Sequence, residues 1–310
     1  MLNNILYSTF EQNIIISIQN SIMFLAPFFK QVGLLCGSDM FMIIILILYL
    51  IYDKKLAKII AMSYTLSSAL TGFIKNLVAR QRPFQVNSQI QCVQSPGEHM
   101  NIFSDHHKAP PKALHNTHHH SYSFPSGHSS SGASFYGSIA NYVRNKYITI
   151  ICAVLIVLIG FSRIFLGVHF PSDVIAGIIL GLLCVFFVSY LFEKFDSYTP
   201  YIIIFVILLL IEIVFHSTQN LSSIATFLGF ALAFIFEEKF VDFEITHDTV
   251  PAVSRIVCGV ILYFILEYLS INTFNSGSLR IVSGFLTNFI LFGIYPWVFS
   301  RISIFSGSDN

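Results

Sequence analysis

Three residues that could do chemistry lie close together between two strongly apolar segments of the chain: Arg163, His169 and Asp173. Pro171 suits the first turn of a helix, because the N–H that proline lacks would have no partner there. His169 would then lie just outside this helix and Asp173 inside its first turn, where the carboxylate can reach back to the imidazole. A histidine oriented by an acid, beside a fixed cation, is a usual construction of a nucleophile for an anionic substrate. A polar connection between helices that merely contains a histidine is the alternative for this stretch alone.

Lys75 and Arg82 form a second group, at the end of another apolar segment. The two residues are seven positions apart, which is two turns of a helix, so both would project from one face. Pro83 would end that helix, because the residue before a proline avoids the helical conformation. Such a pair can bind an anion, although two cations at a membrane surface can also be simple interfacial anchors.

Ser126, Gly127 and His128 open the next apolar segment. A serine can cap a helix here, and the free N–H groups of a helix start form an anion site. Gly127 would let the backbone approach a ligand closely, and His128 could donate a proton. Alone, this pattern could be an ordinary cap beside a histidine. With the other two groups, it predicts that cations, histidines and an acid converge on one anion site, since charges at membrane depth are functional by default.

The composition indicates the elements that must position these residues. Hydrophobic residues make up 55% and charged residues 11% of the chain, and the mean hydropathy is +0.71. A soluble domain carries about twice that share of charge. The apolar runs approach the roughly 20 residues that cross a bilayer, so we expect an all-α transmembrane bundle of about nine spans. The spans are expected at 39–52, 56–76, 126–143, 147–166, 171–192, 199–216, 220–237, 250–270 and 278–300.

Charge asymmetry predicts how the bundle is oriented. Alternate loops hold most of the basic residues outside the motifs: Lys54, Lys55, Lys58, Arg144, Lys146, Lys194, Lys239 and Arg301. By the positive-inside rule these loops face the cytoplasm, so the motifs face the periplasm, the cell exterior or an organelle lumen. Residues 4–30 are expected to form an amphipathic helix in the membrane interface. A bacterial cytoplasmic membrane is favoured over the endoplasmic reticulum.

The three groups together resemble a known family. They are similar, in order, to the three-part signature of the type-2 phosphatidic-acid phosphatase superfamily. The matching residues are Lys75 with Arg82-Pro83, then Pro125-Ser126-Gly127-His128, then Ser162-Arg163 with His169 and Asp173. The resemblance covers roughly residues 30–195. The nine-span layout resembles the branch that contains glucose-6-phosphatase and the sphingosine-1-phosphate phosphatases.

This resemblance implies a metal-independent hydrolysis of a phosphomonoester or diphosphate, without a cofactor. It implies that His169 attacks phosphorus, that Asp173 holds its tautomer, and that His128 protonates the leaving oxygen and later deprotonates water. The phosphoryl oxygens would be held by Lys75, Arg82, Arg163 and the backbone at Ser126 and Gly127.

The expected substrate is a lipid phosphate or diphosphate, such as a polyprenyl diphosphate, a phosphatidate-type lipid or a sphingoid phosphate. A sugar-phosphate phosphatase is the alternative enzyme, and a catalytically silent lipid-binding or transport protein is the alternative from another class. A haloperoxidase that binds vanadate is disfavoured by the membrane location. The expected partners are the bilayer and the lipid substrate, with no nucleic acid; a homo-oligomer is left open.

Two regions carry further expectations. Residues 1–195 would form the interfacial helix and the phosphatase core, with 196–310 adding helices to the same domain. In the loop 84–124 we favour a mobile, pH-responsive lid over a metal site, because its histidines show no ligand spacing: His99, His106, His107, His115, His118, His119 and His120. Arg80 is interpreted as a surface residue, with a contact to a second phosphate or to lipid headgroups as the alternative.

Overall fold

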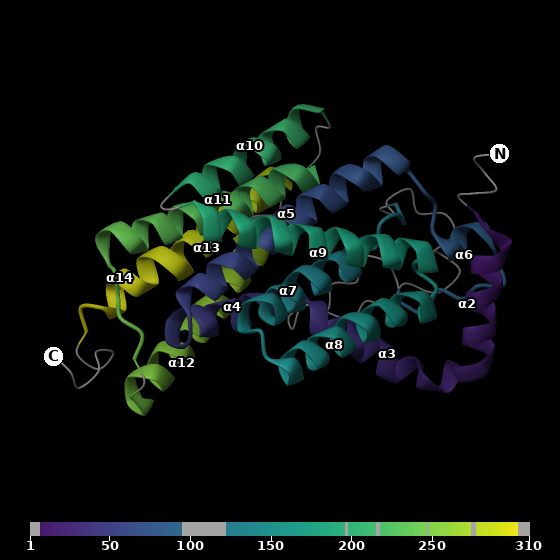
Figure 1. Cartoon of the computed structure of the whole chain (residues 1–310), viewed down its shortest axis with the longest axis horizontal. Helices are drawn as coiled ribbons and strands as arrows, with labels where there is room; N and C mark the ends of the chain where they lie inside the picture. Colours follow the sequence, from purple (N-terminus) through teal and green to yellow (C-terminus); the bar gives the residue numbers. More distant parts are fainter. Residues whose placement is uncertain are drawn as a thin grey trace. The chain divides into compact units, whose positions relative to one another are not determined.

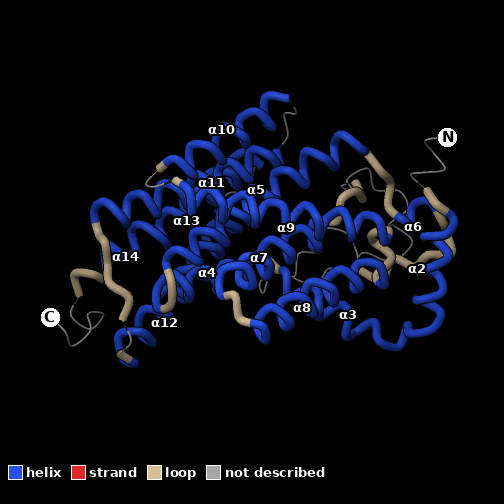
Figure 2. The backbone as a smooth tube through the Cα atoms, in the orientation of Figure 1, coloured by secondary structure: helices blue, strands red, loops and turns tan. Residues whose placement is uncertain are grey.

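The structure is a computed structural model in which the described residues form helices joined by loops and turns, without a strand (Figures 1 and 2). The predicted all-α class is confirmed. The described residues are 7–94, 122–195, 198–214, 218–246, 248–273 and 277–302. The chain forms two compact units, one of residues 1–40 with 70–183 and the other of 41–69 with 184–310.

The first unit contains every residue of the three motifs. Its N-terminal part comprises α2 (Thr9–Ile22) and α3 (Ala26–Val32), separated and followed by the 3₁₀ turns Met23–Leu25 and Gly33–Cys36. It also holds the end of α5 (Lys54–Val78), the short α6 (Pro83–Val86), α7 (Gly127–Val143), α8 (Lys146–Phe165) and the first part of α9 (Pro171–Lys194).

Local sequence explains where α7, α8 and α9 begin. The Ser126 hydroxyl caps α7 by accepting the Ser129 N–H at 3.3 Å, and the Asn145 side chain caps α8 by accepting the Tyr147 N–H at 2.9 Å. Pro171 is the first residue of α9, as predicted, because the helix start needs no N–H at that position. These starts place Asp173 in the first turn of α9 and His169 just before it.

Two small residues bring α9 against the backbone of α7. A Cβ on Gly177 would lie 2.5 Å from the Ser126 carbonyl oxygen, and one on Gly181 would lie 2.4 Å from that of Ser130. Only glycine permits this approach. At the start of the two helices the Ser126 N–H donates to the Asp173 carbonyl oxygen at 2.9 Å. The close packing therefore brings the first turn of α7 to the first turn of α9.

The N-terminal helix α2 packs against the segment that carries the third motif. Ile15 of α2 forms an apolar cluster with Phe84, Ile90 and Phe170, all buried. Figure 1 shows α2 beside α6 at the end of the unit where α8 ends and α9 begins. The helix thus has a protein-facing side, and its predicted place in the membrane interface stays a prediction.

The second unit packs around an aromatic core and one buried carboxylate. It contains most of α4 (Ser38–Ile51), the first part of α5, α10 (Thr199–Val214), α11 (Thr218–Phe240), α12 (Thr249–Thr273), α13 (Gly277–Phe289), a π-helical turn (Ile290–Ile294) and α14 (Tyr295–Phe299). Glu237 accepts hydrogen bonds from the Tyr49 hydroxyl and the Lys54 ammonium, each at 2.8 Å, and from the Phe243 N–H at 3.1 Å. A buried charge with three donors is satisfied, and it fixes how these helices meet.

Apolar helices lie at all nine predicted positions, but fewer are long enough to span a bilayer. Six described helices meet that length and composition, or seven if the pair 9–36 and 38–51, bent by 45°, is one broken span. The prediction of about nine spans was therefore too high. The helices α4, α7 and α10 have only 14, 17 and 16 residues, which is short of the roughly 20 that a bilayer requires.

The segment between Lys75 and Arg82 also differs from the prediction. The helix α5 ends at Val78 rather than at Pro83, and Ala79 adopts a left-handed φ of 50°. Pro83 instead begins α6, whose Gln85 side chain accepts the Arg82 N–H at 2.8 Å. The two cations therefore lie on different elements, not on one helical face.

Candidate active site

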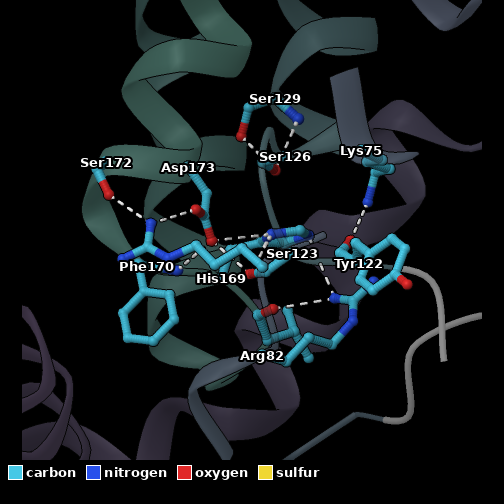
Figure 3. Close-up of polar contacts among 12 residues, drawn as sticks. Lys75, Arg82, Tyr122, Ser123, Ser126, Ser129, His169, Phe170, Ser172 and Asp173 are labelled. Carbon is cyan, nitrogen blue, oxygen red and sulfur yellow. Dashed lines mark hydrogen bonds and ion pairs between the residues drawn. The ribbon is translucent and has the colours of Figure 1, made fainter. Parts of the chain in front are cut away.

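His169 lies at the centre of the polar cluster in the first unit, with only 3% of its surface exposed (Figure 3). Its Nδ1 faces the Asp173 Oδ2 at 3.5 Å and the Ser123 hydroxyl at 3.4 Å. Its Nε2 faces the Arg82 Nη1 at 3.4 Å. The two ring nitrogens therefore meet opposite charges.

These contacts define the tautomer of His169. A guanidinium can only donate, so the Nε2 beside Arg82 carries the lone pair and the Nδ1 beside Asp173 carries the proton. Burial, together with the charges of Arg82 and Lys75, lowers the pKa of His169 to about 3, although the contact with Asp173 opposes this shift. The ring is therefore neutral at physiological pH, with its lone pair directed at the cations.

Asp173 is fully buried, and both of its carboxylate oxygens are bonded. Oδ2 accepts the Ser123 hydroxyl at 2.5 Å and the Phe170 N–H at 2.8 Å. Oδ1 accepts Arg80 Nη1 at 2.6 Å. These three donors on three segments fix the plane of the carboxylate that faces His169.

The predicted phosphate-binding cations are all buried in this unit. Lys75 Nζ donates to the Tyr122 carbonyl oxygen at 2.5 Å, and Arg82 Nη1 donates to that of Val168 at 2.9 Å. Arg82 lies within electrostatic reach of both Lys75 and Arg163, so it is repelled by each of these two cations. Arg163 donates from Nε to the Ser162 hydroxyl at 3.0 Å. Its Nη2 has no hydrogen-bond partner, although the side chain is only 3% exposed.

The second motif is positioned as a helix start, as predicted. Ser126 is buried and uses its hydroxyl as the cap of α7. Gly127 is the first residue of α7, and a Cβ there would meet only Thr71 Cγ2 at 3.8 Å. His128 is half-buried in the first helical turn. The contact between Ser126 and Asp173 brings this turn to the His169 cluster.

The structure adds three residues that the sequence did not assign to the site. Arg80 is 3% exposed and bonded to Asp173, so its interpretation as a surface residue was wrong. Ser123 lies between His169 and Asp173, and Glu11 of α2 binds Arg80 at 2.8 Å. Arg80 lies in the motif that the sequence singled out, whereas no spacing signal connects Glu11 to residues so distant in the chain.

The histidines of the predicted lid, from His99 to His120, lie outside the described residues. Among the residues that the structure does describe, no group of three His, Cys, Asp or Glu side chains is arranged to hold a metal ion.

Residues 56–197 match the PAP2 superfamily, and residues 221–308 match the transmembrane extension of PAP2 superfamily phosphatases. The chain is 42% identical over 90 residues to a phosphatidylglycerophosphatase B from Bacillus subtilis (strain 168), over 26% of this chain and 44% of that protein. It is 39% identical over 67 residues to a lipid A 4'-phosphatase from Porphyromonas gingivalis, over 22% of this chain and 28% of that protein. The chain thus matches less than half the length of these curated relatives.

A crystal structure of a transmembrane PAP2-type phosphatidylglycerolphosphate phosphatase from Bacillus subtilis is also similar. It has a TM-score of 0.44 and 24% identity, over 63% of this chain and 92% of that one. The two sequence matches, with the apolar helices, identify an integral membrane protein. All three motifs lie within the first matched region. The chain therefore belongs to the PAP2 superfamily of type-2 phosphatidic-acid phosphatases.

Proposed function

We propose that the chain is an integral membrane phosphatase that hydrolyses a lipid phosphate or lipid diphosphate through a phosphohistidine on His169. One observation carries the proposal: His169 is buried and neutral, with Nδ1 facing a carboxylate and Nε2 facing a cation. This arrangement suits a nitrogen nucleophile for an anionic electrophile, because the proton is held away from the attacking lone pair.

In the first step the Nε2 lone pair forms a bond to phosphorus, and the bond from phosphorus to the leaving oxygen breaks. His128 gives its proton to that oxygen, so the leaving group departs as an alcohol or, from a diphosphate, as a lipid phosphate protonated on that oxygen. The imidazole becomes positively charged, and Asp173 stabilises it across Nδ1. The long Nδ1–Oδ2 distance of 3.5 Å is expected to shorten when this charge develops.

In the second step a water molecule attacks phosphorus while His128 takes its proton. The N–P bond breaks, phosphate leaves, and His169 regains its lone pair. The same residue serves as acid and then as base, so the two steps return the site to its starting protonation. No metal or cofactor takes part in this scheme.

The buried cations support an anionic ligand at this place. Arg163 Nη2 is deeply buried without a hydrogen-bond partner, which costs free energy unless a ligand satisfies it. A phosphoryl group would also relieve the repulsion among Lys75, Arg82 and Arg163. Arg82 would exchange its contact with Nε2 for a phosphoryl oxygen, which would release the lone pair for attack. Ser126 and Gly127 would contribute the free N–H groups of the helix start.

The substrate class rests on the relatives and the membrane setting. The similar curated proteins are named as phosphatases of phosphatidylglycerophosphate and of lipid A, so a lipid phosphate is favoured over a sugar phosphate. By the charge rule the site faces away from the cytoplasm, and the bacterial relatives favour a bacterial cytoplasmic membrane. A catalytically silent protein is disfavoured because His128, His169 and Asp173 are all present.

Phosphate release from protein purified in detergent micelles tests the proposal. The panel contains phosphatidate, a sphingoid-base phosphate, a polyprenyl diphosphate and glucose 6-phosphate. We expect turnover of at least one lipid, with kcat/KM above that for the sugar phosphate, and a loss on the order of 10⁴-fold in His169→Gln. Turnover of glucose 6-phosphate alone would favour the sugar phosphatase. Near-normal turnover in His169→Gln would exclude the phosphohistidine.

Arg163→Gln and Arg144→Gln form a matched pair for the phosphate contacts. Each change removes one guanidinium from the same unit, but Arg144 is exposed at the far end of α7. We expect the first variant to lose activity and the second to keep it. Equal activity of the two variants would contradict the role of Arg163.

A further inference from the structure

Both terminal nitrogens of the Arg80 guanidinium donate to protein groups. Nη1 donates to the Asp173 carboxylate at 2.6 Å and to the Ser172 hydroxyl at 2.7 Å. Nη2 donates to the Glu11 carboxylate at 2.8 Å. The planar group also lies 3.9 Å from the centre of the Phe170 ring. Arg80 is therefore committed to protein contacts, unlike Arg163 with its unsatisfied Nη2.

Glu11 connects Arg80 to the start of α9. Its Oε2 accepts Arg80, while its Oε1 accepts the Ser172 N–H at 2.7 Å. That N–H belongs to the first turn of α9 and has no partner within the helix. A carboxylate at a helix N-terminus is also favoured by the helix dipole. One side chain of α2 thus binds both Arg80, which contacts Asp173, and the start of the helix that carries Asp173.

The contacts of Asp173 show what this arrangement controls. Oδ2, the oxygen that faces His169, is held by Ser123 and the Phe170 N–H. Arg80 binds Oδ1, and this second anchor keeps the carboxylate from rotating about its bond to Cβ. Asp173 is fully buried, and a buried carboxylate that loses its cation tends to take up a proton or to move. Either change would leave the developing imidazolium of His169 without a fixed anion.

We propose that Arg80 and Glu11 are positioning residues for the hydrolysis: they hold Asp173 ionised and correctly oriented towards His169, and neither of them contacts the phosphate. This inference rests on the proposed function of the site. It makes α2 part of the active-site wall. It also gives two buried arginines in this unit different tasks, Arg163 for the phosphoryl group and Arg80 for the acid.

The test compares kcat, KM and the Ki of inorganic phosphate in Arg80→Gln, Arg80→Lys and Arg163→Gln. We expect kcat of Arg80→Gln to fall about 100-fold, because a misplacement of about 1 Å at a reacting group costs that much. Its KM and the Ki of phosphate should stay within about three-fold of the wild type, since uniform binding is untouched. Arg80→Lys should recover part of kcat, because an ammonium can still reach Asp173. Arg163→Gln should instead weaken phosphate inhibition.

Glu11→Gln keeps the inference testable if Arg80→Gln does not fold. Glu11 is partly exposed, and the amide keeps the size of the side chain, so we expect a folded protein with kcat lowered about ten-fold and KM unchanged. Glu238→Gln is the matched control, since that half-exposed carboxylate pairs with Lys58 at 3.4 Å in the second unit. Kinetic constants are expressed per folded protein, as measured by thermal unfolding.

Three results would overturn the inference. One is a higher Ki of phosphate in Arg80→Gln with kcat unchanged, which would make Arg80 a phosphate ligand. Another is a loss of activity that only follows the loss of folded protein, and the third is Glu11→Gln with the kcat of Glu238→Gln.

If the wild type turns over no substrate, that result would instead contradict the proposed function. The inference would then be decided by diethyl pyrocarbonate acylation of His169, read by mass spectrometry: slower acylation in Arg80→Gln supports it, and an unchanged rate overturns it.

Discussion

Gly167→Ala is expected to be damaging, because Gly167 forms the turn between Arg163 and His169 under two independent constraints. Its φ is +73°, a left-handed conformation that costs an alanine about 1–2 kcal/mol. A Cβ there would lie 2.3 Å from the Gln91 carbonyl oxygen and 3.0 Å from Gln19 Nε2. The first of these atoms is backbone, so it cannot move aside by a simple rotation.

The clash falls on the contacts that hold this turn. Gln19 Nε2 donates to the carbonyl oxygens of Gln91 at 2.8 Å and of Phe165 at 2.9 Å, and its Oε1 accepts the Gln91 N–H at 3.0 Å. Moving the turn away from Gln91 weakens these three hydrogen bonds of Gln19, and overpacking of this kind costs about 1–3 kcal/mol. With the backbone term, Gly167→Ala should destabilise the protein by about 2–5 kcal/mol.

The assay is thermal unfolding in detergent micelles, together with phosphate release per folded protein. We expect Tm to fall by roughly 3–8 °C and the remaining activity to fall about 100-fold, because the turn positions His169. The control is Gly284→Ala in α13, where a Cβ would meet only Thr226 Oγ1 at 3.5 Å. That variant should be as stable as the wild type or gain up to about 1 kcal/mol. A Gly167→Ala protein with the Tm and activity of the wild type would show that neither the positive φ nor the contact with Gln91 constrains this turn.

Arg163, His169 and Glu237 each have a separate role that a single substitution can test. Arg163→Gln should raise the Ki of inorganic phosphate about 10- to 100-fold, since a charged hydrogen bond is lost; Arg144→Gln should leave it unchanged, and equal constants would argue against the role. Since the pKa of His169 is about 3 in the folded protein and 6.5 ordinarily, the unfolded chain takes up the extra proton. The contribution of His169 to the free energy of unfolding is then complete above pH 6.5 and falls by about 1.4 kcal/mol per pH unit towards pH 3. Denaturant titrations at several pH values should show that the free energy of unfolding depends less steeply on pH in His169→Gln. Glu237→Gln should cost about 3 kcal/mol of stability by weakening the buried contact to Lys54, with kcat per folded protein unchanged; a fall in kcat would count against a structural role.

Much of the site follows from residue type and local spacing. The Ser126 cap and the helix start at Pro171 depend on neighbouring residues only, so the sequence predicts them and the structure confirms both. They place Asp173 within one turn of His169. The positions of the apolar helices likewise follow from composition, because a run of apolar residues is visible without any knowledge of its partners.

The parts that could not be predicted depend on contacts between distant segments. Arg80 is buried because Glu11 and Asp173 meet it from two other elements, and no local pattern indicates that meeting. The helix α5 ends at Val78 because the chain turns at Ala79, whereas periodicity alone continues the helix to Pro83. The span count was too high because every apolar segment was taken as a span, although α4, α7 and α10 are shorter than a bilayer requires.

Trapping the intermediate shows whether Nε2 of His169 carries the phosphoryl group. The purified protein is mixed briefly with a lipid substrate labelled with ³²P in its phosphate, quenched in base and digested for mass spectrometry. We expect a base-stable, acid-labile label on the peptide that contains His169, present in the wild type and Arg144→Gln and missing in His169→Gln. Label on another residue, or full turnover in His169→Gln, would contradict it.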